Sequence, residues 1–290
     1  MPETIKIESL SKTYGKARGI EKINLKIEKG EVFGFIGPNG AGKSTTIKCI
    51  MNLINKNAGE IFINGEECNK KNTKQKEIIG YLPSEIHLYE DLTVKKMLEY
   101  SASFYKKDCK KKTEELVKKL EVDTSKKIDE LSLGNLKKVG IILALMHSPQ
   151  IVIMDEATSG LDPLMQEQFY EIIEEEKKKG TTIFFSSHIL SEIKRICDKV
   201  AIIKEGKIEK VDKVENLTDS NFVKVTVVSN NIKEIKEELK IELISQEELK
   251  IEFMYQENMD ELIKVLQKYK IHKLLINEPS IEEIFMHYYK

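Results

Sequence analysis

Residues 37–45 read Gly37-Pro38-Asn39-Gly40-Ala41-Gly42-Lys43-Ser44-Thr45, and this stretch decides the fold. The pattern Gly-x-x-x-x-Gly-Lys-Ser is that of the phosphate-binding P-loop, in which glycines let successive backbone amides point at phosphate oxygens. An apolar segment with the pattern of a buried strand precedes the loop. Apolar residues at helical spacing follow it, namely Ile47, Ile50, Met51 and Ile54. This order predicts the strand, loop and helix of a nucleotide-binding site.

The motif also predicts roles for single residues. Lys43 would place a positive charge at the β- and γ-phosphates of ATP, and the Ser44 hydroxyl would bind Mg²⁺. The N-terminus of the following helix adds the positive end of its dipole. The remaining loop positions expected to contact ATP are Asn39, Gly40, Ala41, Gly42 and Thr45.

Length and composition restrict the class of protein. The chain has 290 residues, which suits one large domain and one small one, and its net charge is −1. Its lysines alternate with glutamates, as on solvated helix faces, so we expect no nucleic-acid partner. The 4 cysteines are scattered without a C-x-x-C pair, which indicates neither zinc nor a disulfide framework and fits a reducing cytosol.

No part of the sequence predicts a membrane segment. The N-terminus has no apolar region of the kind found in signal peptides. The longest apolar run, Val139–Met146, is far shorter than the roughly 20 residues that span a bilayer. We therefore expect a cytoplasmic protein, and another chain must supply the span if the protein acts at a membrane.

Strand and helix patterns alternate over residues 1–217. A helix at about 166–179 ends at Gly180, and residues 86–148 are mostly helical in pattern. The expected strands are 4–8, 23–28, 31–36, 151–154, 181–186, 199–204 and 207–211. This order favours an α/β core with parallel strands, interrupted by a helical subdomain.

Residues 218–290 change pattern and predict a second domain. Apolar residues at helical spacing lie within 232–239 and 259–266, and a last helix is expected from Ser280, which forms a capping box with Glu283. The expected strands are Phe222–Val228, 241–245, 248–254 and Ile271–Ile276, with a turn at Gln246-Glu247. The resulting β-α-β-β-α-β order is that of a small ferredoxin-like α+β domain.

Two adjacent carboxylates close the apolar strand 151–154. Acidic residues at strand ends are common, but here they follow a P-loop and precede a Ser-Gly-Leu-Asp turn. Asp155 would orient the Mg²⁺ shell, and Glu156 would polarise the water that attacks the γ-phosphate.

Several further segments resemble the motifs of ABC-transporter ATPases. Leu131-Ser132-Leu133-Gly134-Asn135 is similar to the signature motif, commonly Leu-Ser-Gly-Gly-Gln. Ser159–Asp162 resembles the D-loop, and His188 after Ser186-Ser187 resembles the switch histidine. Tyr14 stands where the family has an aromatic residue that stacks on adenine. The Asn135 form of the signature, and residues 278–285, resemble the branch of two-component exporters with a separate permease.

This resemblance implies a P-loop NTPase fold of the ABC type and a dimeric ATPase. Two subunits, which we expect to be identical, would close around two MgATP. Ser132, Gly134 and Asn135 would contact the γ-phosphate of ATP held by the other subunit. Glu156 would be the general base and His188 would hold the attacking water.

The resemblance further implies a partner. A multi-span membrane permease would insert a coupling helix between the Ser84 loop and the helical subdomain, and would hold the ATPase at the inner face of the cell membrane. The permease selects the cargo, so antibiotic, peptide, lipid, polysaccharide and sodium ion all stay open. Residues 218–290 would stabilise the dimer or regulate it.

Two positions depart from the family pattern. Many members have Gln after the Tyr-x-Pro segment, where this chain has Ser84 and Glu85. The Ser84 side chain is too short to replace Gln directly, so we hypothesise that Glu85 or a water on Ser84 takes over. Ala157 stands where relatives often have Pro, a mild change because Pro there would serve rigidity.

Two alternatives belong to other classes. One is a soluble ABC-type ATPase that acts in translation or DNA repair. Such translation factors carry two cassettes per chain and such repair proteins insert a long coiled coil, and neither feature is present. The other is a regulator that binds nucleotide without hydrolysing it, which the set Lys43, Asp155, Glu156 and His188 opposes.

Overall fold

The computed structural model describes residues 3–15, 17–69, 73–218, 223–239, 241, 243–256 and 258–277. The chain divides into two compact units, Met1–Val214 and Glu215–Lys290. The last helix expected from Ser280, its capping box with Glu283 and the segment 278–285 lie outside the described residues.

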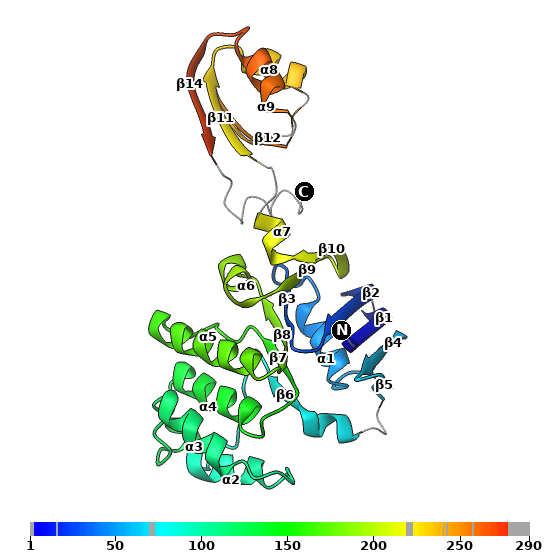
Figure 1. Ribbon diagram of the computed structural model, residues 1–290, viewed down its shortest axis with the longest axis vertical. Coiled ribbons are helices and arrows are strands. Elements are labelled where there is room, and N and C mark those ends of the chain that lie inside the picture. The colour runs from blue at the N-terminus through cyan, green and yellow to red at the C-terminus, as the bar shows by residue number, and fades with distance from the viewer. Residues whose placement is uncertain are drawn as a thin grey trace. The chain divides into compact units, whose positions relative to one another are not determined.

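The first unit is built on a mostly parallel sheet (Figure 1). In the described part of the chain, six strands follow the order β10-β9-β3-β8-β7-β6, and all are parallel to their neighbours except the edge strand β10. Their bounds are β3 (Val32–Ile36), β6 (Ile79–Leu82), β7 (Ile151–Asp155), β8 (Thr182–Ser187), β9 (Lys199–Lys204) and β10 (Lys207–Lys213). The central strands β3, β7 and β8 are buried along their whole length, because helices cover both faces of a parallel sheet. The α/β core expected from the sequence is confirmed.

A second, antiparallel sheet has the order β2-β1-β4-β5. Its strands are β1 (Glu3–Tyr14), β2 (Ala17–Glu28), β4 (Ala58–Ile63) and β5 (Glu66–Glu67). The apolar faces of this sheet and of the parallel sheet enclose helix α1 (Lys43–Ile50) in one buried core. The sequence analysis did not predict β4, β5 or β6.

Helix α1 ends earlier than its apolar spacing suggested. The spacing predicted a helix through Ile54, but the helix stops at Ile50 with Met51 as its C-cap. Asn52 then takes a φ of 53°, which turns the chain away from the helix axis. Ile54 still packs against the same core, so its apolar character reflects burial in the turn.

Residues 83–150 leave β6 and return to β7 by way of three helices. These are α2 (Val94–Ala102), α3 (Lys110–Lys119) and α4 (Leu133–Leu145). Two short 3-10 turns, Thr73–Ile78 and Ile128–Glu130, precede β6 and α4. Since β6 and β7 are parallel neighbours, α4 serves as the crossover helix between them. Helices α5 (Pro163–Lys178) and α6 (Leu190–Ile196) lie with α4 on the face of the sheet opposite α1 (Figure 1).

The second unit has the predicted ferredoxin-like topology. Helix α7 (Val214–Thr218) spans the boundary between the units, and then the elements follow as β-α-β-β-α-β. They are β11 (Val223–Ser229), α8 (Ile232–Leu239), β12 (Leu243–Gln246), β13 (Lys250–Tyr255), α9 (Met259–Leu266) and β14 (Ile271–Asn277). The antiparallel sheet has the order β12-β13-β11-β14, and one face packs on α8 and α9. Gln246 belongs to β12, so the turn begins one residue later than expected.

Candidate active site

The P-loop joins β3 to α1, and close packing requires glycine at two of its positions, Gly37 and Gly42. A Cβ added to Gly37 would lie 2.4 Å from the Ile203 carbonyl oxygen, and one added to Gly42 would lie 2.6 Å from Cγ2 of Ile20. Gly42 also has a φ of 112°, which L side chains rarely adopt. Contacts with the neighbouring strands therefore hold the P-loop in its shape.

Lys43 is held inside the loop. Its side chain is only 4% exposed, although it carries a charge. The ammonium donates hydrogen bonds to the carbonyl oxygens of Gly37 (2.6 Å) and Pro38 (3.2 Å). It also lies 3.3 Å from Oε1 of Glu156. The cation is thus satisfied by the loop and by one carboxylate from the end of β7.

The two carboxylates at the end of β7 have different surroundings. Asp155 is fully buried, and its Oδ1 accepts a hydrogen bond of 2.6 Å from the Ser186 hydroxyl. Its Oδ2 is buried without a hydrogen-bond partner in the described part of the chain. Glu156 is partly exposed and has a φ of 50°. Its amide donates to the carbonyl oxygen (3.1 Å) and the hydroxyl (3.2 Å) of Ser186, which fixes this backbone conformation.

His188 lies on the other side of the Glu156 carboxylate from Lys43. Its Nδ1 lies 3.5 Å from the same Oε1 of Glu156 that faces Lys43. The preceding residue, Ser187, accepts a hydrogen bond from the amide of Ile189 and donates one to the buried carboxylate of Glu192. These bonds set the direction in which the chain leaves β8. The P-loop, Glu156 and His188 follow the neighbouring strands β3, β7 and β8, where the carboxyl ends of a parallel sheet bring them together.

The segment Leu131–Asn135 lies in a separate place. Ser132 is the N-cap of α4, and its hydroxyl accepts a hydrogen bond from the amide of Asn135 (3.4 Å). Leu133 is 68% exposed, and a Cβ added to Gly160 would come within 3.0 Å of it, so this segment adjoins Ser159–Asp162. Within the described residues, no hydrogen bond or ion pair joins this segment to the P-loop.

Tyr14 lies at the end of β1 and is 44% exposed. The ammonium of Lys12 sits 5.1 Å from the centre of its ring. Lys12 pairs with Ile20 of β2, whose side chain approaches Gly42. The hairpin end that carries Tyr14 is therefore adjacent to the P-loop.

Three residues of this region were not singled out from the sequence. Ser186 bonds both Asp155 and Glu156, and Glu192 bonds Ser187. Lys137 is buried in α4 and bonds the carbonyl oxygen of Ser84. Ser186 stands in the Ser-Ser-His segment and was within reach of motif reasoning, whereas nothing in the local pattern marks Lys137.

Comparisons with known proteins identify the family. A family profile described as ABC transporter matches residues 20–159. An uncharacterized ABC transporter ATP-binding protein of Methanocaldococcus jannaschii is 34% identical over 283 residues, covering 96% of this chain and 100% of that protein. The chain belongs to the ABC transporter ATP-binding proteins. Another family member, the bacitracin transport ATP-binding protein BcrA of Bacillus licheniformis, is 37% identical over 212 residues, covering 72% of this chain and 69% of that protein.

Solved structures agree with this assignment. The dimeric structure of MJ0796, a bacterial ABC transporter cassette, is 25% identical with a TM-score of 0.67, covering 72% of this chain and 98% of that one. The chain is therefore the ATP-binding subunit of an ABC transporter, an ATPase with the P-loop NTPase fold that the sequence predicted. No helix among the described residues has the length and apolar character needed to cross a membrane.

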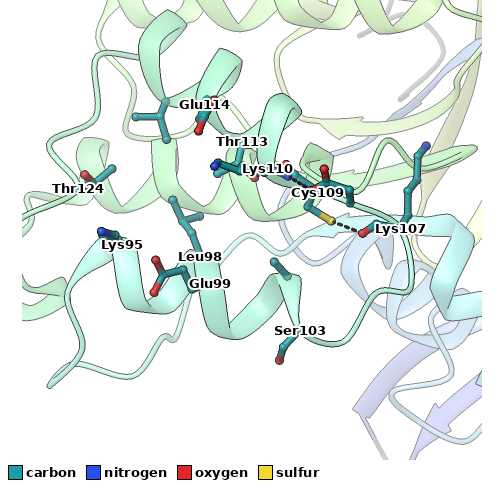
Figure 2. A pocket seen from close by; sticks show the side chains of 13 residues that line it. Lys95, Leu98, Glu99, Ser103, Lys107, Cys109, Lys110, Thr113, Glu114 and Thr124 are labelled. Carbon is teal, nitrogen blue, oxygen red and sulfur yellow. Dashed lines mark hydrogen bonds between the residues drawn. The ribbon is translucent and has the colours of Figure 1, made fainter.

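A pocket of about 830 Å³ lies elsewhere in the ABC unit, between α2 and α3 (Figure 2). Leu98 and Val117 supply part of its apolar lining. The positive and negative charges of its lining are equal in number, and the residues that carry them are Lys95, Lys107, Lys110, Glu99, Asp108 and Glu114. None of the P-loop or carboxylate residues lines this pocket, so we assign it no part in ATP hydrolysis.

Proposed function

We propose that this chain hydrolyses MgATP as one half of a dimer that drives a separate exporter permease. The observation that carries the proposal is the position of the Glu156 carboxylate between the Lys43 ammonium (3.3 Å) and the His188 imidazole (3.5 Å). A carboxylate at the end of a strand beside a phosphate-binding loop is placed to accept a proton from water.

Phosphate binding would begin with an exchange of partners at Lys43. Its ammonium would give up the carbonyl oxygens of Gly37 and Pro38 for β- and γ-phosphate oxygens. The amides of Asn39–Thr45 and the N-terminus of α1 would supply further donors to the phosphates. The free space around Gly40, where an added Cβ would meet no atom within 4 Å, leaves room for this approach.

Ser44 and Asp155 are the residues that would hold Mg²⁺. Asp155 fits this role because its Oδ2 is buried and has no hydrogen-bond partner among the described residues, although Oδ1 has one. An oxygen of that kind is a suitable ligand for a hard cation or its bound water. When bound, Mg²⁺ neutralises charge on the phosphates.

Glu156 and His188 would then act on the attacking water. The oxygen of the water bonds to the γ-phosphorus while Glu156 accepts a proton from the water. The bond between the γ-phosphorus and the leaving oxygen of ADP breaks. His188 donates a hydrogen bond that orients the water or the γ-phosphate. Oε1 of Glu156 contacts Lys43, so engagement of the Lys43 ammonium by phosphate would free this oxygen for catalysis.

Dimerisation would complete the site. The donors at Ser132, Gly134 and Asn135 lie at the N-terminus of α4, which favours an anion. These donors have no bond to the P-loop of their own chain among the described residues, so we assign them to ATP in the other subunit, expected to be a second copy. The solved MJ0796 cassette is dimeric, which supports this arrangement.

Export by a separate multi-span permease is supported by the names of the relatives. These include a bacitracin transport protein, a lantibiotic transport protein and a linearmycin resistance protein. The chain would thus lie on the cytoplasmic face of the membrane, held there by its permease.

The decisive experiment uses Glu156→Gln in the full chain. We expect the turnover of ATP to fall about 100-fold or more, since general-base catalysis contributes roughly 10²–10⁴-fold. ATP binding should persist, and ATP should now trap a dimer that sedimentation detects. The matched control is Glu171→Gln, which changes an exposed carboxylate of α5. Unchanged turnover in Glu156→Gln would contradict the proposal and favour a chain that only binds nucleotide.

A further inference from the structure

Helix α4 is packed closely against β6 and the loop that follows it. A Cβ added to Gly80 of β6 would lie 1.9 Å from the Ala144 carbonyl oxygen, and one added to Gly140 would lie 2.5 Å from Cδ1 of Ile86. Lys137 precedes Gly140 by one helical turn, so it lies on the same face of the helix. This face of α4 therefore packs directly against β6 and against the loop of residues 84–88, called the Ser84 loop.

Lys137 is unusual for a lysine because only 2% of it is exposed. Its ammonium donates a hydrogen bond of 3.2 Å to the carbonyl oxygen of Ser84. Among the described residues, no carboxylate lies within ion-pair distance of it. A buried charge without a direct counter-ion is costly, so its placement calls for a functional reason.

The charged groups that act on the Lys137 ammonium belong to the active site. Burial lowers the pKa of Lys137, while Asp155 and Glu156 oppose this effect by favouring the charged form. The ammonium thus lies in the electric field of both site carboxylates while its hydrogen bond goes to the Ser84 loop. Glu85, which we hypothesised to take over the role of the family's Gln, is 87% exposed and lies beside His87.

We propose that Lys137 is a positioning residue for ATP hydrolysis, which ties the Ser84 loop to α4 beside Asp155 and Glu156. The inference rests on the proposed function and deepens it. Ser84 lacks the long side chain of the Gln that many family members have here, and the Lys137 ammonium of α4 holds the loop through the backbone carbonyl of Ser84.

The same helix begins at Ser132, the donor assigned to ATP in the other subunit. A shift of α4 on dimer closure would therefore carry the Ser84 loop with it, because Lys137 and Gly140 join the two. Lys137 would act through this loop and through its field on the carboxylates, without touching the nucleotide.

The test compares Lys137→Met, Lys137→Gln and the control Lys138→Met in the full chain. Methionine keeps the length and removes the charge and the donor, while glutamine keeps a donor. We expect Lys137→Met to lower kcat about tenfold, the effect of one charge-assisted hydrogen bond, with the KM for ATP within about twofold of wild type. Lys137→Gln should recover part of kcat, and Lys138→Met should change neither constant.

Amide hydrogen exchange shows whether the loss of kcat arises in the Ser84 loop, while the split between kcat and KM separates a positioning role from a loss of ATP binding. With ATP bound in a Glu156→Gln background, Lys137→Met should speed exchange in residues 84–88 while the peptides of β3 and β8 keep their protection. Wild-type kcat and exchange in Lys137→Met would overturn the proposal. If melting curves show that Lys137→Met does not fold, wild-type values in Lys137→Gln would overturn it equally. Failure of the proposed function gives a different result from failure of the Lys137 proposal, because Glu156→Gln would then hydrolyse ATP as fast as wild type.

Discussion

Glu156 lies between Lys43 and His188 and has a strained backbone conformation. Its φ of 50° lies in the left-handed region, which costs a non-glycine residue roughly 1–3 kcal/mol. Two hydrogen bonds from its amide to Ser186 hold it there. Such strain persists where the surroundings over-determine the conformation. At this residue it turns the side chain from the end of β7 toward Lys43 and His188.

The exposed ring of Tyr14 allows a test of stacking on adenine. Tyr14→Ala should weaken ATP binding about tenfold, because stacking of a base on an aromatic ring is worth roughly 1–3 kcal/mol. Tyr14→Phe should bind ATP within about twofold of wild type, since stacking needs only the face of the ring. Calorimetric titration of ATP into each variant, in a Glu156→Gln background, measures both affinities. Tyr89→Ala removes another exposed tyrosine and is the control; equal losses in it and in Tyr14→Ala would refute the stacking role.

Sequence motifs locate those site residues whose chemistry requires a fixed order along the chain. Lys43 is found from its place in the P-loop, and Glu156 from its place at the end of an apolar strand. Lys137 could not be found in this way, because lysines are abundant in this sequence and most are exposed. Its burial depends on Gly140 bringing α4 close to the Ser84 loop, a contact between segments that are distant in sequence.

Helix α4 ends beside a buried histidine. His147 is 3% exposed and stacks on Tyr105, with ring centres 4.0 Å apart. Burial lowers its pKa to about 4 from an ordinary value of 6.5. As the pH falls, His147 is protonated in the unfolded chain before it is protonated in the folded chain. Its contribution to the free energy of unfolding is therefore fully present above pH 6.5 and is lost between pH 6.5 and 4.

This shift predicts a measurable pH dependence of folding. Between pH 7.5 and 5.0 the wild-type chain should lose about 2 kcal/mol of unfolding free energy that His147→Gln does not lose. Urea unfolding at the two pH values measures the difference. His87→Gln changes an exposed histidine and should lose stability with pH as wild type does. A pH dependence of His147→Gln identical to that of wild type would show that His147 already titrates normally in the folded chain.

The elements themselves were predictable where burial imposes a simple pattern. Strands β3 and β7 are buried on both faces and give nearly continuous apolar runs, and β8 is apolar at its centre. Strand β4 has mixed exposure and contains Gly59, and β6 has only four residues, so neither gives a clear period. The end of α1 was placed too late because the apolar Ile54 packs on the core from a turn, which spacing alone cannot distinguish from a helix.

The second unit has a hydrophobic core of its own. Its sheet and two helices bury residues such as Val225, Phe253 and Leu262. Its topology was predictable because strand and helix periods alternate cleanly over residues 223–277. We retain the proposal that this unit stabilises or regulates the dimer.

The proposed permease gives a prediction for the whole chain. When the tagged full-length chain is purified from membranes of its native cell in mild detergent, a multi-span membrane protein should accompany it at about one-to-one stoichiometry. The reason is the proposed exporter function, in which a separate permease supplies the pathway through the membrane. Mass spectrometry of the purified complex provides the measurement. Recovery with ribosomes or DNA in place of a membrane protein would contradict the transport role and leave the ATPase activity standing.

The way in which Lys43 is held has a consequence for selectivity among anions. Its ammonium already has two carbonyl oxygens and a carboxylate as partners, so it does not present a bare charge to the solvent. An isolated phosphate or sulfate ion would have to displace these partners with few contacts of its own. A triphosphate reaches the loop amides, the N-terminus of α1 and Lys43 together, and these joint contacts offset the exchange. We therefore expect common inorganic anions to compete poorly with ATP at this loop.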